Sequence, residues 1–258
     1  MRKIVIGVVA LSILAITPQT EAAVRRPACA GIDHRTNAPP AMADENTLVG
    51  QRWDAAHGVW SEVDLVAVSN GSAAYHYKLW QQGTANGVGA PIDTTLAYVK
   101  TLVTKTRHQG VPTAWEMLRS IKRTNGKAVI EMHYAWTQGH VQGLVNQIRT
   151  LGLQQRIWLT GTKARLAMLK PLIGPLFQVM YRVKPDKPAN DALLQKYGAD
   201  VVQVRGSERI QRVRYYRNHG YPVWGSGPRS AWPALKALGI RRVQTDLPVG
   251  WIRYCKAR

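Results

Sequence analysis

The sequence is short of acidic residues, of cysteine and of long apolar runs. Only 15 of its 258 residues are Asp or Glu, against 35 Lys or Arg, so its formal net charge is +20. Its two cysteines are too few for a disulfide-dense small scaffold or a zinc ribbon. A single apolar run near the N-terminus excludes a polytopic membrane protein. Apolar residues still make up 45% of the chain, which excludes a disordered chain.

The N-terminal segment has the pattern of a secretory signal peptide. Arg2 and Lys3 precede the apolar run at 4–16, and small residues follow at Ala22 and Ala23. The run is shorter than the roughly 20 residues of a bilayer-spanning helix, although an uncleaved anchor is the alternative. We expect residues 1–22 to be removed and residues 23–258 to fold as one domain in a secreted, periplasmic or other extracytoplasmic location.

Extended and helical segments alternate along the rest of the chain. The pattern predicts strands at 29–34, 61–68, 73–78, 128–133, 156–160, 177–183, 200–204, 222–225 and 241–245. It predicts helices at 47–56, 113–123, 139–151, 162–172, 190–196, 207–218 and 231–238.

This alternation predicts an α/β protein with parallel strands, and its size fits a single (β/α)₈ TIM barrel of about 250 residues. A doubly wound open sheet is the alternative, but the first strand leads into Asp33-His34-Arg35-Thr36, which is not a glycine-rich phosphate loop. Ser69-Asn70-Gly71-Ser72 contains the Asn-Gly pair of tight hairpins. We therefore expect an antiparallel hairpin between the second and third strands.

The two cysteines lie near opposite ends of the expected mature chain. Cys29 begins the first predicted strand and Cys255 follows the last. Because the first and last elements of a closed barrel are neighbours, a Cys29–Cys255 disulfide is predicted, with two free thiols as the alternative.

Polar side chains stand where a barrel strand would carry apolar ones. Glu62 and Asp64 are two residues apart, so they share one face of their strand, and the same holds for Glu131 and His133. A barrel gathers its reactive groups at the carboxyl ends of its strands. His34 also lies at such an end, and His76 and Arg35 lie close to one.

Three acids on inward strand faces are a large share of the 15 acidic residues of the chain. A bound divalent cation would offset the free-energy cost of burying them. Oxygen ligands without cysteine favour Ca²⁺ or Mg²⁺. The alternative is that Glu62, Asp64 and Glu131 pair with Arg or Lys, and that the histidines are structural.

An ordered set of short segments resembles the glycerophosphodiester phosphodiesterases. The segments are His34-Arg35, Glu45-Asn46-Thr47-Leu48, Glu62-Val63-Asp64, His76, Val111-Pro112-Thr113, Glu131, Val223-Trp224 and Thr245-Asp246-Leu247-Pro248. No single segment is specific, but together they span nearly the whole expected mature chain.

The resemblance implies a (β/α)₈ barrel and a role for each matching residue. It implies that His34 and His76 are the acid/base pair, and that Arg35 binds the phosphate with Glu45 beside it. Further implied roles are a divalent metal held by Glu62, Asp64 and Glu131, a substrate-binding His133, and a pocket wall at Trp224, for which a purely structural tryptophan is the alternative. The expected reaction converts a small glycerophosphodiester to sn-glycerol 3-phosphate and an alcohol.

Three positions depart from the family pattern. Tyr77 stands where the family usually has Asp, His133 where it has Lys, and Thr36 where it has Gly. A histidine is mostly neutral above a pH of about 6.5, so His133 weakens a positive charge near the phosphate. Because no predicted acid/base residue or metal ligand is lost, we expect an active enzyme with altered specificity or pH optimum.

The positive charge admits other interpretations. Residues 205–217 form the densest basic stretch, which is either a solvated helix face or a surface attracted to anionic membranes or wall polymers. A catalytically inactive polyanion binder and a phospholipase D of the sphingomyelinase type are the competing functions. No motif for specific nucleic-acid binding is present, and no feature specifies an oligomeric state.

Overall fold

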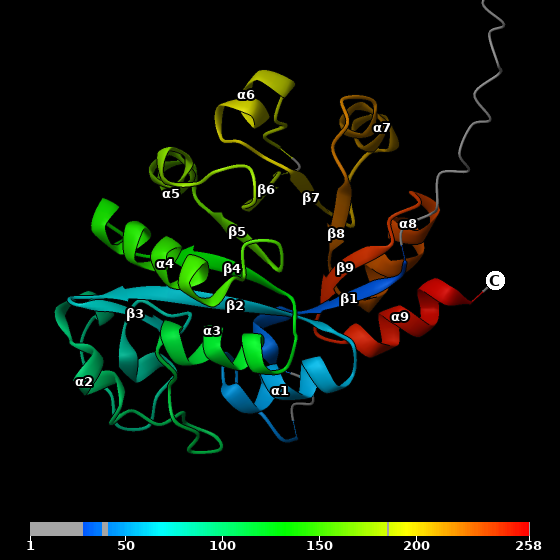
Figure 1. Ribbon diagram of the computed structural model, residues 1–258. Coiled ribbons are helices and arrows are strands. Elements are labelled where there is room, and N and C mark those ends of the chain that lie inside the picture. Colours follow the sequence, from blue (N-terminus) through cyan, green and yellow to red (C-terminus); the bar gives the residue numbers. More distant parts are fainter. Residues whose placement is uncertain (1–27, 38–40, 185, 258) are drawn as a thin grey trace, which may run out of the picture.

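The computed structural model describes residues 28–37, 41–184 and 186–257, so the predicted signal peptide lies outside the described residues. Within these ranges nine strands form one sheet in the order β1-β9-β8-β7-β6-β5-β4-β2-β3, and β1 also pairs with β2. This pairing closes eight parallel strands into a TIM barrel, while β3 lies outside the ring and pairs antiparallel with β2. Helices surround the ring (Figure 1), which confirms the predicted fold and hairpin.

The strands and helices of the described residues have the following bounds. The strands are β1 (Ala30–Asp33), β2 (Trp60–Val68), β3 (Gly71–Ala74), β4 (Ala128–His133), β5 (Ile157–Gly161), β6 (Gln178–Arg182), β7 (Val201–Arg205), β8 (Val223–Ser226) and β9 (Arg242–Thr245). The α-helices are α1 (Leu48–Ala56), α2 (Leu96–Val99), α3 (Ala114–Arg123), α4 (Gln138–Leu151), α5 (Lys163–Leu169), α6 (Asp191–Lys196), α7 (Ile210–Asn218), α8 (Trp232–Ala237) and α9 (Pro248–Lys256).

Several helices begin at side chains that bond their first free backbone N–H groups. Thr113 accepts a hydrogen bond from the N–H of Glu116, whose carboxylate accepts from the N–H of Thr113, so a capping box starts α3. Thr47 and Asn190 accept in the same way at α1 and α6. Because these caps fix where helices leave the preceding loops, they also fix the loops at the barrel's carboxyl end.

Of the three apolar clusters in the described residues, one packs β2 and β3 against α2, and the other two form the layers of the barrel itself. The larger one packs the outer face of the strands against the helices, as Leu118 of α3 and Val145 of α4 do. The smaller one fills the inside of the barrel, where Trp60, Trp158 and Trp224 contact one another. The barrel is thus filled beneath its carboxyl end, and polar groups can face solvent only above this layer.

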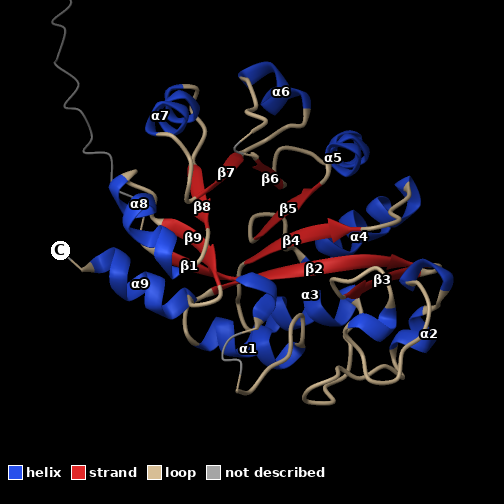
Figure 2. Cartoon of the chain, turned by 180° about the vertical axis from the view of Figure 1, so that it is seen from behind, coloured by secondary structure: helices blue, strands red, loops and turns tan. Residues whose placement is uncertain are grey.

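Some predicted elements differ from those observed. The third strand was predicted over 73–78 but ends at Ala74, because the chain leaves the sheet there to form the long excursion that includes α2 (Figure 2). The helix predicted over 162–172 is α-helical only to Leu169 and continues as a 3₁₀ turn, since Pro171 cannot donate to the helix ladder. Helices α2 and α9 were not predicted.

The disulfide joins the two ends of the described chain. Cys29 and Cys255 are bonded, with Cα atoms 6.0 Å apart, which confirms the predicted pairing. The bond ties the residue before β1 to α9, next to the β1–β9 pair that closes the barrel. Among the helices of the described residues, none has the length and hydrophobicity needed to cross a bilayer.

Candidate active site

Three carboxylates converge inside the barrel, two from the first half of β2 and one near the carboxyl end of β4. The two strands pair in a register that puts the Cα of Asp64 opposite that of Glu131, and Glu62 lies one inward position below. Ligand oxygens of Glu62, Asp64 and Glu131 lie within 4.8 Å of one another. Glu62 and Asp64 are only 1% and 2% exposed, so their charges must be compensated inside the protein.

Two imidazoles compensate Asp64. Its Oδ2 is 2.8 Å from Nδ1 of His76, and its Oδ1 is 2.9 Å from Nε2 of His133. Burial by itself raises the pKa of Asp64, but these two histidines outweigh it and hold the pKa far below the usual range. The Asp64 N–H also donates to Oδ1 of Asn46, which fixes the top of β2. Asp64 is therefore ionised and rigidly placed.

Arg35 joins this cluster because its backbone adopts a left-handed conformation. With φ at 59°, its N–H donates to Oε2 of Glu62 over 2.9 Å. Its guanidinium donates to Glu45, lies 3.5 Å from Asp64 Oδ2, and approaches Nε2 of His76 to 2.9 Å. Burial lowers the pKa of Arg35, but the negative charges of Glu45 and Asp64 raise it by more than burial lowers it. The net shift of the pKa is therefore upward.

The contacts of His76 define its tautomer. A guanidinium only donates and an ionised carboxylate only accepts. Nδ1 of His76, facing Asp64, therefore carries the proton, and Nε2, facing Arg35, presents a lone pair. This is the arrangement of a histidine prepared to take up a proton.

Arg182, at the end of β6, was not predicted as a site residue. Its guanidinium donates to Oε1 of Glu62 over 2.8 Å, to Glu131, and to Gln244 over 3.3 Å. The alternative interpretation of the acids, pairing with arginine, therefore holds for all three, since Arg35 forms an ion pair with Asp64. The signal was present in the sequence: Arg182 is the next-to-last residue of the predicted strand 177–183, whose other residues are mostly apolar.

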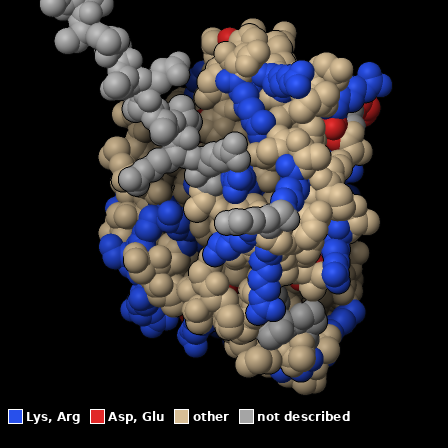
Figure 3. Space-filling view, turned by 90° about the vertical axis from the view of Figure 1, so that its right-hand side faces the viewer, with Lys and Arg blue, Asp and Glu red and all other residues tan. Residues whose placement is uncertain are grey.

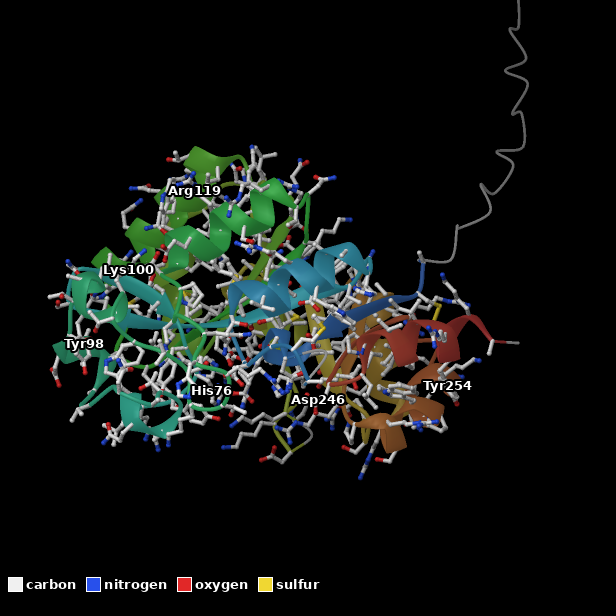
Figure 4. The ribbon with its side chains drawn as sticks, turned by 90° about the horizontal axis from the view of Figure 1, so that it is seen from below. His76, Tyr98, Lys100, Arg119, Asp246 and Tyr254 are labelled. Carbon is white, nitrogen blue, oxygen red and sulfur yellow. A yellow bond between two sulfur atoms is a disulfide. The ribbon has the colours of Figure 1, made fainter. Side chains whose placement is uncertain are left out.

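His34 and His76 lie at the same end of the barrel but line different cavities. His34 lines the larger one, of about 790 Å³, and its Nδ1 is 3.0 Å from Asp246 Oδ1. His76 lines the smaller one, of about 310 Å³, with Glu45 and Tyr77. Figure 4 places His76 and Asp246 toward one edge of the molecule. The structure thus brings His76, but not His34, into the carboxylate cluster; Asp246 was quoted in a motif but not predicted to contact His34.

Two further predicted positions have clear surroundings. Trp224 is buried among Trp60 and Trp158 beneath the site and is absent from the residues that line either cavity, which matches the structural alternative. Tyr77, which replaces the family's Asp, donates its hydroxyl to Oε2 of Glu45 over 3.3 Å. Tyr77 therefore supports the partner of Arg35 with its hydroxyl, and its ring packs edge-on against the imidazole of His76, with centroids 5.1 Å apart.

The carboxylate cluster fits a divalent cation. Oxygen ligands lie about 2.3–2.6 Å from Ca²⁺, so ligands on opposite sides of one ion are separated by about 5 Å. The ligand oxygens of the three acids all lie within 4.8 Å of one another, which is inside that limit. On the neighbouring strand, the buried hydroxyl of Thr160 has no hydrogen-bond partner among the described residues, which leaves a polar group beside Glu131 for a further contact. A second group, Asp64, His76 and His133, meets the same distance criterion.

Comparison with solved structures shows what the fold is similar to. A Galdieria sulphuraria protein assigned as a glycerophosphodiester phosphodiesterase matches with a TM-score of 0.77 and 18% identity, covering 90% of this chain and 100% of its own. The Agrobacterium tumefaciens glycerophosphodiester phosphodiesterase gives 0.74 and 16%, covering 87% and 99%. An Oleispira antarctica phosphodiesterase, solved with its product sn-glycerol-3-phosphate, gives 0.72 and 20%, covering 88% and 96%.

These matches confirm the resemblance at the level of fold. No family model matches the sequence, and no curated protein does. The chain has the TIM-barrel fold of the glycerophosphodiester phosphodiesterase structures over about nine-tenths of its length.

Proposed function

We propose that this protein is a metal-dependent glycerophosphodiester phosphodiesterase that releases sn-glycerol 3-phosphate and an alcohol. The observation that supports this most is the convergence of Glu62, Asp64 and Glu131 within 4.8 Å, beside Arg35 and His76. The TIM-barrel fold shared with phosphodiesterase structures supports the proposal, since barrel enzymes carry out their chemistry at the carboxyl end of the strands.

In this proposal Glu62, Asp64 and Glu131 hold Ca²⁺ or Mg²⁺, which would supply positive charge to the phosphate oxygens. Arg35 donates charge-assisted hydrogen bonds to the same phosphate, held in place by Glu45. His133 contacts Asp64 and Glu131, so it can orient these acids. Its neutral ring can donate one hydrogen bond, from whichever nitrogen carries the proton.

The two histidines would divide the proton transfers. His76 presents Nε2 as an acceptor and takes the proton of the attacking hydroxyl once substrate displaces its contact with Arg35. His34 directs Nδ1 at Asp246, so in its imidazolium form it can give the Nε2 proton to the departing alkoxide from the larger cavity and keep the Nδ1 proton bonded to Asp246. Arg35 follows His34 in the chain and contacts Nε2 of His76, so a phosphate bound to Arg35 would lie near both histidines.

The test is a hydrolysis assay on the mature protein, residues 23–258. It should release glycerol 3-phosphate from glycerophosphoglycerol with Ca²⁺ or Mg²⁺ present and lose this activity in chelator. Glu62→Gln and His76→Ala should each lower kcat by a factor of about 100 or more, since such groups contribute about 10²–10⁴. Asp93→Asn, an exposed acid outside both cavities, is the matched control and should retain wild-type rate.

Other outcomes would overturn the proposal. A wild-type rate in Glu62→Gln would show that the carboxylate cluster takes no part in the reaction. Free choline from sphingomyelin, with no glycerol 3-phosphate from any diester, would favour the phospholipase D alternative. Salt-sensitive binding to DNA without hydrolysis would favour a polyanion binder.

We further propose that the protein works outside the cytoplasm. The basic, apolar and small-residue pattern of residues 1–22 supports this location. A disulfide between Cys29 and Cys255 also fits an oxidising compartment. Fractionation of cells that express the full chain, with N-terminal sequencing of the product, tests both the location and the cleavage point.

A further inference from the structure

The larger cavity has an excess of positive charge that the proposed reaction does not use. Four cationic side chains line it: Lys163 at the start of α5, Lys184 after β6, Lys187, and Arg205 at the end of β7. None of the four pairs with a carboxylate among the ion pairs of the described residues.

The acids of this cavity are already engaged. Glu131 bonds Arg182, and Asp246 bonds His34. With Arg182 included, five cations line a recess whose acids are Glu131 and Asp246, so positive charge is in excess there. Like charges gathered in a recess create a positive potential that is screened less than on an open surface and attracts anions.

Two of the lysines are held together by the backbone. Lys184 and Lys187 pair in an isolated antiparallel bridge, in which the Lys187 N–H donates to the Lys184 carbonyl over 3.1 Å. Like charges directly opposite each other across an antiparallel pair are destabilising. A bound anion would relieve this repulsion, whereas free lysines would gain nothing from the arrangement.

The overall charge does not account for this placement. Lys and Arg are spread widely over the surface and far outnumber acids on the face in Figure 3. Most of these side chains stand in open solvent, where salt screens them. The four cavity cations are exposed too, but they line one recess together with His34 and Glu131.

We propose that the larger cavity is an anion subsite for the alcohol part of the substrate, which carries a phosphate of its own. This inference rests on the proposed function, in which the scissile diester lies at Arg35 and the alcohol leaves past His34. The preferred substrate class is then a glycerophosphodiester whose alcohol is phosphorylated, either a small molecule or a chain of glycerol phosphate units. An alcohol with a quaternary ammonium group would meet four like charges and be disfavoured.

The experiment compares substrates that differ only in the charge of the alcohol. We expect kcat/KM for glycerophosphoglycerol phosphate to exceed that for glycerophosphoglycerol by at least about tenfold, and glycerophosphocholine to be poorer than both. A glycerol phosphate hexamer separates the sources: a rate well above that of the small phosphorylated diester indicates a polymer, and a lower rate a small molecule. Equal kcat/KM for the phosphorylated and neutral diesters would overturn the subsite.

A double variant tests the residues. Lys163→Gln with Arg205→Gln should reduce the preference for the phosphorylated diester by about tenfold. Arg119→Gln with Arg123→Gln removes the same charge from exposed positions on α3, and Figure 4 shows Arg119 on the opposite side of the molecule from His76 and Asp246. This control should keep the preference. If both double variants lose it equally, general surface charge and not the cavity attracts the substrate.

A binding measurement separates failure of the subsite from failure of the proposed function. Glycerol 1,3-bisphosphate contains no diester and is a probe that the reaction does not consume. By calorimetry it should bind at least about tenfold more tightly than glycerol 3-phosphate, and Lys163→Gln with Arg205→Gln should abolish the difference. This result without hydrolysis of any diester would refute the proposed function alone. Equal affinity for the two probes would refute the subsite.

Discussion

At the scale of single residues, the site consists of two buried carboxylates, Glu62 and Asp64, and the partly buried charged groups that pair with them. Asp64 is balanced by two imidazoles and Arg35, whereas Glu62 and Glu131 share one guanidinium, that of Arg182. Removing one partner of a buried pair leaves an uncompensated charge, which costs far more than an exposed pair contributes. The acids of this site thus depend on cations for stability as well as for chemistry.

Arg182→Gln should reveal this dependence. Without divalent ion, the variant should lose about 3 kcal/mol of unfolding free energy, because nearly all of Glu62 is buried and would lose its charged partner. Ca²⁺ should restore part of the loss and should stabilise the variant more than the wild type, since the carboxylates would then lack a competing cation. Urea unfolding with Ca²⁺ and with chelator measures both effects. If Ca²⁺ raises the free energy of unfolding of the two proteins equally, Arg182 does not compete with a metal ion for the carboxylates.

Whether a contact in the site could be predicted depended on how far apart its two residues lie in the sequence. Glu62 and Asp64 share a strand face by their spacing alone, so their proximity was predictable. Arg182 and Asp246 reach their partners only through barrel closure, across sequence separations of 120 and 212 residues. Alternation along one strand says which face a side chain takes but not which distant side chain it meets, so these contacts could not be read from the sequence.

At the scale of elements, the nine strands were predictable because their apolar alternation and flanking turns are local signals. Helix α9 was missed since its Pro248-Val-Gly start reads as a loop, and packing of Trp251 into the core overrides that local preference. The end of β3 was placed too late because the sequence from Ala73 stays apolar and aromatic beyond the last strand residue. Local pattern therefore predicted where strands exist better than where they stop.

The junction of β1, α1 and β2 has its own acidic pair, outside the proposed site. Asp54 of α1 is fully buried and bonded to Asp33 and to the hydroxyl of Ser61. Burial is the main cause that raises its pKa well above the usual value, and the charge of Asp33 adds to this. At a pH between the ordinary Asp pKa and the raised one, the folded protein therefore holds a proton at this pair that the unfolded chain has released.

This pair should make the fold less stable as the pH rises. A raised folded pKa contributes stability that is complete below the ordinary Asp pKa of about 4 and is lost as pH climbs through the raised value. Asp64, with its lowered pKa, acts oppositely and loses its contribution as the pH falls below about 4. Asp54→Asn keeps an acceptor for Ser61 and a donor for Asp33 without a titrating group. Urea unfolding from pH 5 to 9 should therefore show a smaller decline for the variant. Parallel declines would mean that another group controls this range.

At the scale of the whole molecule, the barrel is closed by hydrogen bonds between β1 and two strands from opposite ends of the chain. β1 pairs with β2 over two residue positions and with β9 over four. These short contacts hold the element that carries His34 and Arg35 into the site. The Cys29–Cys255 bond lies just outside this seam, so it stabilises the part of the fold on which the geometry of the site depends.

Replacing both cysteines by serine should therefore weaken the whole fold. The bond closes a loop with a sequence separation of 226 residues, and loss of such a link typically costs about 2–5 kcal/mol, because the unfolded chain regains conformational entropy. Urea denaturation of Cys29→Ser with Cys255→Ser, compared with wild type, measures the change. A reducing agent should destabilise the wild type to the level of the variant and leave the variant unchanged, which separates loss of the bond from the effect of serine. Activity should fall at a lower urea concentration in the variant, since the seam next to His34 and Arg35 would open more easily. If both proteins unfold at the same urea concentration, the hydrogen bonds of β1 alone close the barrel.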